Sequence, residues 1–267
     1  MDNRIDQRFL QLRRQGRSGF MAYVTGGDPT LARTVDVALA LSEAGVDFIE
    51  IGIPFSDPLA DGIANQLGAQ RALSAGATVP KLLKTVGEIR KKLELPIILY
   101  SYLNPLFQYG FQKFERDAAI AGADGLLLLD LPPEETLVSD NQGKFLHRIR
   151  LVAPTTPEER VKQIVSRASG FVYYVSREGV TGEQKELSRT IGDHVAMIRR
   201  ATDLPVAVGF GISNAEQAKQ VAVQADAVVV GSAIVRRIGE FSHDRQLPHR
   251  IEEFVRPLVE AVKSVPR

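Results

Sequence analysis

The chain has 267 residues, a length that suits one α/β barrel of roughly 250 residues. Hydrophobic residues make up 44% and charged residues 24%, an ordinary globular balance, and the net charge of +1 comes without a basic cluster. Nucleic acid and anionic membranes are therefore poor partners, and the absence of cysteine excludes disulfides, thiolate nucleophiles and Cys-ligated metals.

The first sixteen residues, 1–16, predict a short amphipathic helix. Ile5, Phe9 and Leu12 fall at i, i+4 and i+7, which is one helical face. Asp2 and Asp6, together with the lack of an apolar stretch, are not typical of a secretory signal. Since no apolar run approaches the roughly 20 residues that span a bilayer, we expect a cytoplasmic protein without a membrane segment.

Eight apolar runs then alternate with helical patterns to the end of the chain. They are nearly continuous in Val, Ile, Leu and aromatic residues, as parallel strands covered on both faces require. The runs lie at 20–25, 47–53, 96–102, 124–130, 149–153, 171–176, 205–210 and 226–230. Between them, Thr78 predicts a helix start, and capping boxes are predicted from Thr156 and from Ser213. The stretch 131–148 has the weakest helical pattern.

Eight β–α units leave two architectures, a closed barrel or a doubly wound open sheet. Their near-equal size favours the barrel, and no GxGxxG follows the first run, which argues against a dinucleotide fold. There is no linker or low-complexity tract. The sequence therefore predicts a single domain over 1–267, an α/β protein with a (β/α)8 TIM barrel and an extra N-terminal helix.

In such barrels the active site lies at the carboxyl ends of the strands. The last two runs lead into Gly211 and into Gly231-Ser232, where glycines allow backbone N–H groups to approach a phosphate at a short helix N-terminus. The alternative is that these glycines only end strands and start loops.

Glu50 is the most informative single residue, because it lies inside an apolar run. It shares a face with Phe48 and Gly52, either toward the barrel interior or toward the helices. Burial without a partner would raise its pKa, so that the carboxyl could give and take a proton near neutrality. The alternative is a structural acid in a salt bridge.

Three other polar residues are candidates with ordinary alternatives. Asp61 lies in a loop rich in Asp, Pro and Gly, where turn formation alone would explain it. Tyr102 and Tyr173 end or occupy predicted strands, where core packing would explain them equally well.

The residues that several common catalytic mechanisms require are missing from the predicted strands. None of the eight runs contains lysine, which a Schiff-base aldolase needs in the barrel interior. The histidines are expected in helical or loop segments, so neither a metal-ligand cluster nor a Ser-His-Asp triad is predicted; they are His147, His194, His243 and His249. What remains is carbon–carbon or proton chemistry performed by carboxylates on a phosphorylated small molecule.

Residues 45–63, GVDFIEIGIPFSDPLADGI, resemble the pattern GADFIELGIPFSDPLADGP of tryptophan synthase α subunits. Similar segments follow in the same order, from about Phe20 to Val235: FMAYVTGGDP, YLNPLFQYG, LLLLDLPPEE, LVAPTTPEER, FVYYVSREGVTG, VGFGIS and VVVGSAIV. IPFSDPLADG and SREGVTG together are highly specific. The resemblance implies a lyase of tryptophan biosynthesis, which cleaves indole-3-glycerol phosphate into indole and D-glyceraldehyde 3-phosphate by a retro-aldol reaction.

The resemblance also implies roles for individual residues. Glu50 would protonate indole C3 and then accept the proton of the glycerol hydroxyl, Asp61 would accept a hydrogen bond from the indole N–H, and Tyr173 would lie beside the glutamate. Tyr102, Val152 and Phe210 would line the indole pocket, Gly182, Gly211, Gly231 and Ser232 would hold the phosphate, and Thr181 would close over the substrate in a mobile lid, 177–190. Pro54 and Asp57 would meet the β subunit of an α2β2 tetramer. No cofactor is expected in this chain, and pyridoxal phosphate is expected in that partner.

The chain departs from the family pattern after Asp61, where Ile63 replaces a proline and Ala64-Asn65-Gln66 follows. The stretch 134–148 is also shorter than usual. Three further alternatives stay open: a freestanding lyase that releases indole, another phosphate-binding barrel such as an isomerase or indole-glycerol-phosphate synthase, and a non-catalytic scaffold that activates its partner. The synthase should show strand lysines, which this chain lacks.

Overall fold

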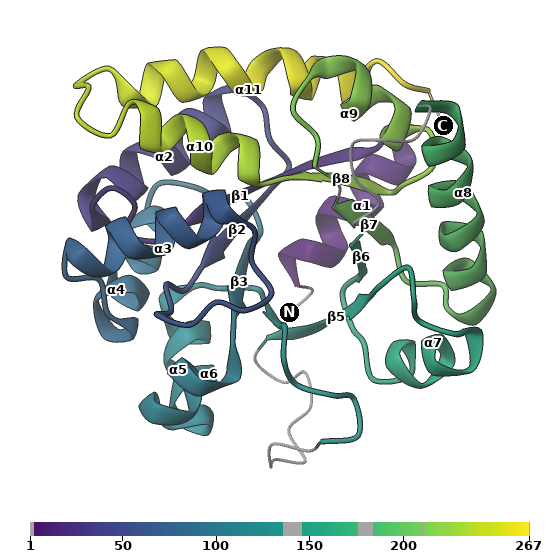
Figure 1. Ribbon diagram of the computed structural model, residues 1–267, viewed down its shortest axis with the longest axis horizontal. Coiled ribbons are helices and arrows are strands. Elements are labelled where there is room, and N and C mark those ends of the chain that lie inside the picture. The colour runs from purple at the N-terminus through teal and green to yellow at the C-terminus, as the bar shows by residue number, and fades with distance from the viewer. Residues whose placement is uncertain (1–2, 136–145, 176–183, 210, 267) are drawn as a thin grey trace.

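The strands of the protein form a closed parallel barrel in the computed structural model, which describes residues 3–135, 146–175, 184–209 and 211–266 (Figure 1). Each strand pairs in parallel with the next, and the last pairs with the first, so the prediction of a TIM barrel is confirmed. The strands are β1 (Gly19–Thr25), β2 (Phe48–Gly52), β3 (Ile97–Ser101), β4 (Gly125–Leu128), β5 (His147–Val152), β6 (Val172–Val175), β7 (Val206–Gly209) and β8 (Ala227–Val230).

Helices surround the barrel on its outside, except for α1, which lies across one end of the barrel (Figure 1). They are α1 (Arg4–Arg14), α2 (Leu31–Glu43), α3 (Ile63–Ser74), α4 (Val79–Arg90), α5 (Leu103–Tyr109), α6 (Phe111–Ala121), α7 (Glu158–Val165), α8 (Gln184–Ala201), α9 (Ala215–Ala222), α10 (Ser232–Glu240) and α11 (Leu247–Lys263). Among the described residues, none of these helices combines the length and the apolar character that a bilayer crossing needs.

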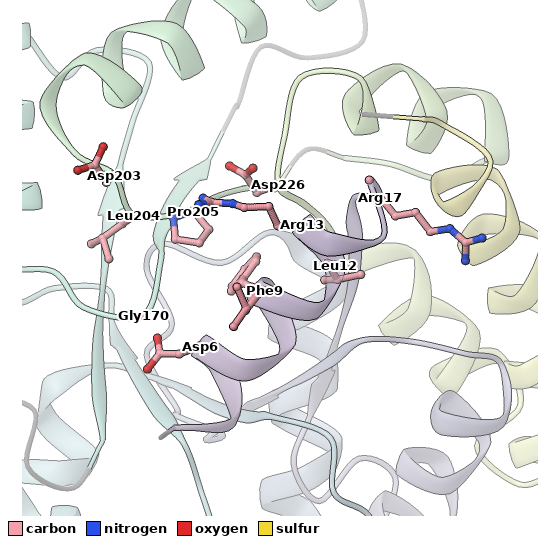
Figure 2. Close-up of a pocket in the computed structure, with 12 residues that line it drawn as sticks. Asp6, Phe9, Leu12, Arg13, Arg17, Gly170, Asp203, Leu204, Pro205 and Asp226 are labelled. Carbon is pink, nitrogen blue, oxygen red and sulfur yellow. The ribbon is translucent and has the colours of Figure 1, made fainter. Parts of the chain in front are cut away.

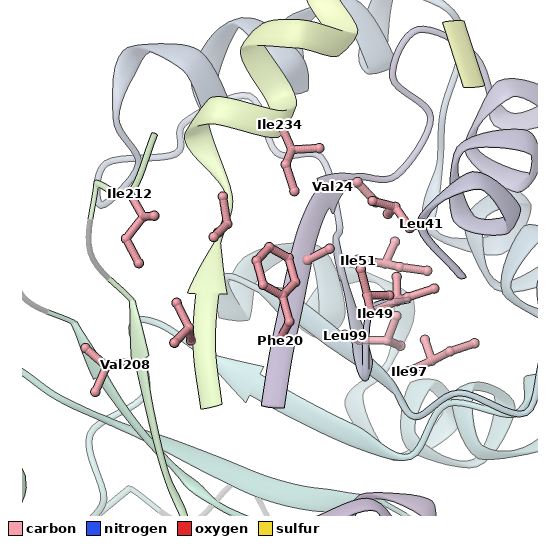
Figure 3. Close-up of a cluster of buried hydrophobic side chains, with 14 of the residues drawn as sticks. Phe20, Val24, Leu41, Ile49, Ile51, Ile97, Leu99, Val208, Ile212 and Ile234 are labelled. Atoms are coloured by element: carbon pink, nitrogen blue, oxygen red, sulfur yellow. The ribbon is translucent and has the colours of Figure 1, made fainter. Parts of the chain in front are cut away.

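Strand side chains alternate between two buried layers, as the period of two requires. One layer packs against the helices and includes Phe20, Ile49, Ile51 and Leu99, some of which Figure 3 shows beside Leu41 of α2. The other layer fills the barrel interior; its strand residues include Met21, Phe48, Ile98, Leu127, Tyr173 and Val229. Both faces of each strand are thus apolar, which explains the nearly continuous hydrophobic runs of the sequence.

The N-terminal helix α1 packs against the end of the barrel where the strands begin. Its predicted stripe, Ile5, Phe9 and Leu12, is buried and belongs to the interior layer. The Phe9 ring centroid lies 4.6 Å from that of Phe48 and 5.7 Å from that of Phe171. Because Phe48 and Phe171 lie at strand starts, α1 covers the end of the barrel opposite to the carboxyl ends of the strands.

Several local predictions need correction. The Thr156 capping box is wrong, because the Thr156 hydroxyl accepts from the Ala153 amide at 3.0 Å in the preceding turn, and α7 begins after Pro157. The cap predicted at Ser213 lies one residue later, at Asn214, whose side chain accepts from the Gln217 amide at 3.0 Å. Thr78 does precede α4, although its side chain makes no capping hydrogen bond.

The prediction that His147 lies in a helix or loop is also wrong. His147 is the first residue of β5, and its Nε2 lies 2.8 Å from an Asp6 carboxylate oxygen of α1. Its position at the amino end of the strand places it away from the carboxyl ends, where barrel active sites lie. The stretch of weak helical pattern, 131–148, therefore ends in a strand, and 136–145 lies outside the described residues.

Candidate active site

Glu50 lies on the inward face of β2. Its neighbours Ile49 and Ile51 belong to the helix-facing layer, whereas Phe48, two residues before it, belongs to the interior layer. Glu50 pairs in register with Tyr23 of β1 and Ile98 of β3, and it is 0% exposed. The sequence left both faces open, and the structure selects the barrel interior.

The environment of Glu50 favours a protonated carboxyl group. Among the described residues, neither carboxylate oxygen has a hydrogen-bond partner, so the alternative of a structural salt bridge is not supported. Burial, followed by the nearby charge of Asp61, raises the pKa of Glu50 from 4.5 to about 8. A carboxyl group with this pKa is a proton donor at neutral pH and becomes an acceptor once it has given its proton.

Asp61 is held by hydroxyl groups from β3 and the residue just beyond it. Tyr100 donates to Oδ1 at 3.0 Å and Tyr102 donates to Oδ2 at 3.0 Å. The Asp61 amide also donates to the Pro58 carbonyl at 3.0 Å, as turn chemistry would predict. Asp61 therefore has two roles, because its backbone forms the turn and its side chain accepts hydrogen bonds in the site. Donated hydrogen bonds of this kind stabilise the charged form of a carboxyl group.

Tyr173 lies on the inward face of β6 and is 8% exposed. Burial and the proximity of Glu50 raise the pKa of Tyr173 well above its usual value, so its hydroxyl stays protonated. An added Cβ at Gly209, its neighbour on β7, would lie 2.7 Å from the Tyr173 hydroxyl oxygen. Glycine at this position therefore makes room for the tyrosine beside Glu50.

The predicted phosphate-binding corner, formed by Gly211, Gly231 and Ser232, lies next to these carboxyl groups. Gly231 caps α10, Ser232 is its first residue, and no side chain makes the capping hydrogen bond, which leaves the helix N-terminus for an outside anion. An added Cβ at Gly231 would lie 3.2 Å from the Tyr23 Cβ, and Tyr23 is the register neighbour of Glu50. Gly211, after β7, has open space where a Cβ would point.

Some predicted site residues lie elsewhere or outside the described part. Val152 is wrong as a pocket residue, because β5 pairs it with Tyr174 and both side chains pack in the helix-facing layer. Its neighbour Leu151 packs against the interior layer instead. Thr181, Gly182 and Phe210 lie outside the described residues, as do 177–183 of the predicted lid, and the rest of that lid is the start of α8.

The loop between β2 and α3 presents apolar side chains to solvent. Leu59 is 83% exposed and Ile63 is 76% exposed. Asp57 is exposed as well, whereas Pro54 is buried in the isolated chain. The surface of this loop available to a partner is thus formed by Asp57, Leu59 and Ile63 and not by Pro54.

Sequence reasoning missed three residues of the site. Tyr23 and Tyr100 lie among the carboxyl groups, and Asn65 Nδ2 lies 3.4 Å from Asp61 Oδ1. Strand periodicity could have identified Tyr100, because it alternates with Tyr102 along one strand. Asn65 could be placed only once α3 was known to begin at Ile63.

A hollow of about 490 Å³ lies at the end of the barrel where the strands begin, opposite to Glu50 and Asp61 (Figure 2). Phe9 and Arg13 of α1 line it together with Gly170, Pro205 and Asp226, the residues that lead into β6, β7 and β8. The packed interior of the barrel therefore separates this hollow from Glu50.

Comparison with known proteins gives a consistent result. The family described as tryptophan synthase alpha chain matches residues 9–263. The tryptophan synthase alpha chain of Opitutus terrae is 49% identical over 240 residues, which are 89% of this chain and 90% of that protein. That of Desulfatibacillum aliphaticivorans is 46% identical over 262 residues, 97% of this chain and 99% of that protein.

Solved structures agree with the sequence matches. The alpha subunit of tryptophan synthase from Legionella pneumophila superposes with a TM-score of 0.90 at 36% identity, over 99% of this chain and 100% of that one. A chain of the open form of M. tuberculosis tryptophan synthase superposes with a TM-score of 0.87 at 32% identity, over 98% and 99% of the two chains. The similarity thus extends over nearly the whole barrel.

Proposed function

The chain belongs to the tryptophan synthase alpha chain family, and we propose that it performs the reaction of that family with Glu50 as the proton donor and Asp61 as the stabilising carboxylate. It is a carbon–carbon lyase of tryptophan biosynthesis, which cleaves indole-3-glycerol phosphate into indole and glyceraldehyde 3-phosphate. The observation that carries the mechanism is a fully buried Glu50, without a described partner, whose pKa is raised to about 8 beside Asp61.

The reaction requires a proton before the carbon–carbon bond can break, since indole is a poor carbanion leaving group. The neutral Glu50 carboxyl protonates C3 of the indole ring, and the positive charge that develops on the ring is shared by its nitrogen. Asp61 accepts a hydrogen bond from the indole N–H and stabilises this charge. The Glu50 carboxylate then takes the proton of the adjacent glycerol hydroxyl while the bond from C3 breaks, which forms the aldehyde, releases indole and restores the neutral carboxyl group.

Other residues hold the substrate for this proton transfer. The N-terminus of α10, with Gly231 and Ser232, binds the phosphate together with the backbone near Gly211. Tyr173, a protonated hydroxyl beside Glu50, packs against the reacting centre. Tyr102 borders the indole pocket through its contact with Asp61. Anchoring the phosphate at one corner fixes the distance of the indole ring from the two carboxyl groups, which lowers the entropic part of the barrier.

The partner of the chain is the tryptophan synthase β subunit, in an α2β2 tetramer whose β subunit carries pyridoxal phosphate. The surface formed by Asp57, Leu59 and Ile63 supports this part of the proposal, since two exposed apolar side chains at the mouth of an active site are typical of a partner contact. Asp57 borders that patch with a charge, as the polar rim of an interface does.

The test is to mix the protein with indole-3-glycerol phosphate and to measure indole, with and without a β subunit. We expect weak release alone, strong activation by the β subunit, and no release from Glu50→Gln in either case. Equal activity with and without the partner would indicate the freestanding lyase. No indole from the wild type would indicate a non-catalytic scaffold if the chain still activates the β subunit, with or without Glu50, and a different phosphate-binding barrel if it does not.

A further inference from the structure

Three side chains in the described part of the protein donate hydrogen bonds to the carboxylate of Asp61. The hydroxyls of Tyr100 and Tyr102 donate to Oδ1 and Oδ2, each at 3.0 Å. Asn65, in the first turn of α3, donates from Nδ2 to Oδ1 over a longer 3.4 Å. Each oxygen thus has one short O–H donor, which fixes the plane of the carboxylate as well as its charge.

The two tyrosines differ in what else they hold. The Tyr102 hydroxyl also accepts from the Ala60 amide at 2.9 Å, so Tyr102 stabilises the loop that carries Asp61. Tyr100 lies on β3, and its ring packs edge-on against Tyr23, with centroids 5.0 Å apart and planes at 70°. Burial, followed by the nearby Tyr23 and Asp61, raises the pKa of Tyr100, so its hydroxyl remains a donor at working pH.

Given the role of Asp61 in the proposed function, we propose that Tyr100 is a positioning residue, whose hydroxyl keeps the Asp61 carboxylate oriented toward the indole nitrogen. Without this hydroxyl, Oδ1 would keep only the longer bond to Asn65 among its described side-chain donors. The carboxylate could then rotate more easily about its bond to Cβ. Tyr100 does not need to touch the substrate for this effect.

Several ionisable groups interact with Asp61. Among the described residues they are Glu50 of β2, Tyr23 of β1, Tyr100 and Tyr102 of β3, and Tyr173 of β6. The pKa of each of these tyrosines is raised by burial, so the tyrosines remain neutral in the range of enzyme assays. The alkaline limb of the pH–rate profile then reports loss of the proton of Glu50.

The decisive variant is Tyr100→Phe, which keeps the ring and removes the hydroxyl. In the complex with the β subunit we expect kcat for indole release to fall about tenfold or more, while KM changes less than about threefold, because the substrate contacts remain. The alkaline limb should stay where the wild type has it.

Two controls separate positioning from general damage. Tyr109→Phe removes the same kind of bond, since the Tyr109 hydroxyl donates to Asp117 at 2.8 Å between α5 and α6, and it should leave kcat and the alkaline limb unchanged. The double variant Tyr100→Phe with Asp61→Asn should be no slower than Asp61→Asn alone, because Tyr100 acts through Asp61.

A Tyr100→Phe variant with wild-type kcat would overturn the proposal. A double variant whose loss equals the product of the two single losses would overturn it as well, since Tyr100 would then act independently of Asp61. Failure of the proposed function has a different signature: the wild type would release no indole, or Glu50→Gln would still release it. The unfolding midpoint in urea, measured for every variant, confirms that the folded enzyme is being compared.

Discussion

Replacing Glu50 with glutamine should change how the stability of the protein depends on pH. The pKa of Glu50 is raised from 4.5 to about 8, mainly by burial. Between these two values the native state holds a proton that the unfolded chain has released, so the free energy of unfolding of the wild type falls as pH rises. Glutamine has nearly the same shape and does not titrate, so the free energy of unfolding of Glu50→Gln should not fall with pH for this reason.

The size of the effect follows from the two pKa values. The interval from 4.5 to about 8, at about 1.4 kcal/mol for each pH unit, corresponds to a loss of about 5 kcal/mol of stability in the wild type. Near about pH 4.5 both proteins carry a neutral side chain at position 50 and should be similar in stability. Near about pH 8 the Glu50→Gln variant should be the more stable by several kcal/mol.

The assay is urea unfolding of both proteins, followed by circular dichroism from about pH 5 to about pH 8. Other groups titrate equally in both proteins, so the difference between the two curves isolates Glu50. Glu115→Gln is the matched control, because Glu115 is also buried but is paired with Arg148; its loss should destabilise the protein, leaving a buried arginine without its partner. A difference between wild type and Glu50→Gln that stays constant over this range would refute the assignment of a raised pKa.

Three further predictions concern the site and its support. Asp61→Asn should slow turnover by raising the barrier by about 2–4 kcal/mol, and a loss of turnover below about tenfold would contradict this. It should also move the alkaline limb of the pH–rate profile to lower pH, since the charge that helps raise the pKa of Glu50 is removed. Ser232→Ala should raise KM more than it lowers kcat and should weaken binding of inorganic phosphate, measured by calorimetry, if α10 holds the phosphate; unchanged values would exclude that contact. Phe9→Ala should lower the free energy of unfolding by about 3–5 kcal/mol in urea, whereas the half-exposed Leu10→Ala should have little effect; equal losses would contradict the docking of α1.

The barrel was predictable because both faces of its strands are apolar. Eight runs of similar length, separated by helical patterns, leave few architectures, and the predicted strands all appear in the structure. His147 was misplaced because β5 begins with a polar stretch, and both His147 and Arg148 precede its apolar residues. The two misplaced helix caps are each off by one residue. The Thr156 hydroxyl bonds to the preceding turn instead of capping α7, and Asn214 takes the place of Ser213 as the cap of α9.

The site was predictable only in part. Alternation along β2 shows which residues share a face with Glu50. It does not show which of the two faces of β2 points into the barrel, because that depends on how the other strands are arranged around it. Val152 shows the same dependence, because a shift of one residue along β5 exchanges it with the inward-facing Leu151. The bond from Tyr100 to Asp61 joins residues of two different segments, which only the folded loop brings together. The bond from Asn65, four residues after Asp61, depends on the start of α3 at Ile63.

Because α1 covers the end of the barrel where the strands begin, the packed interior is closed to solvent at that end. Gly19 and Gly125, at two strand starts, provide the space for this seal: an added Cβ would lie 2.8 Å from the Leu12 side chain at the first and 2.9 Å from the Ile5 side chain at the second. Water, substrate and product must then share the rim at the carboxyl ends of the strands. A molecule that occupies this rim also stands between Glu50 and the bulk solvent, so the occupied enzyme protects its own reactive proton from exchange.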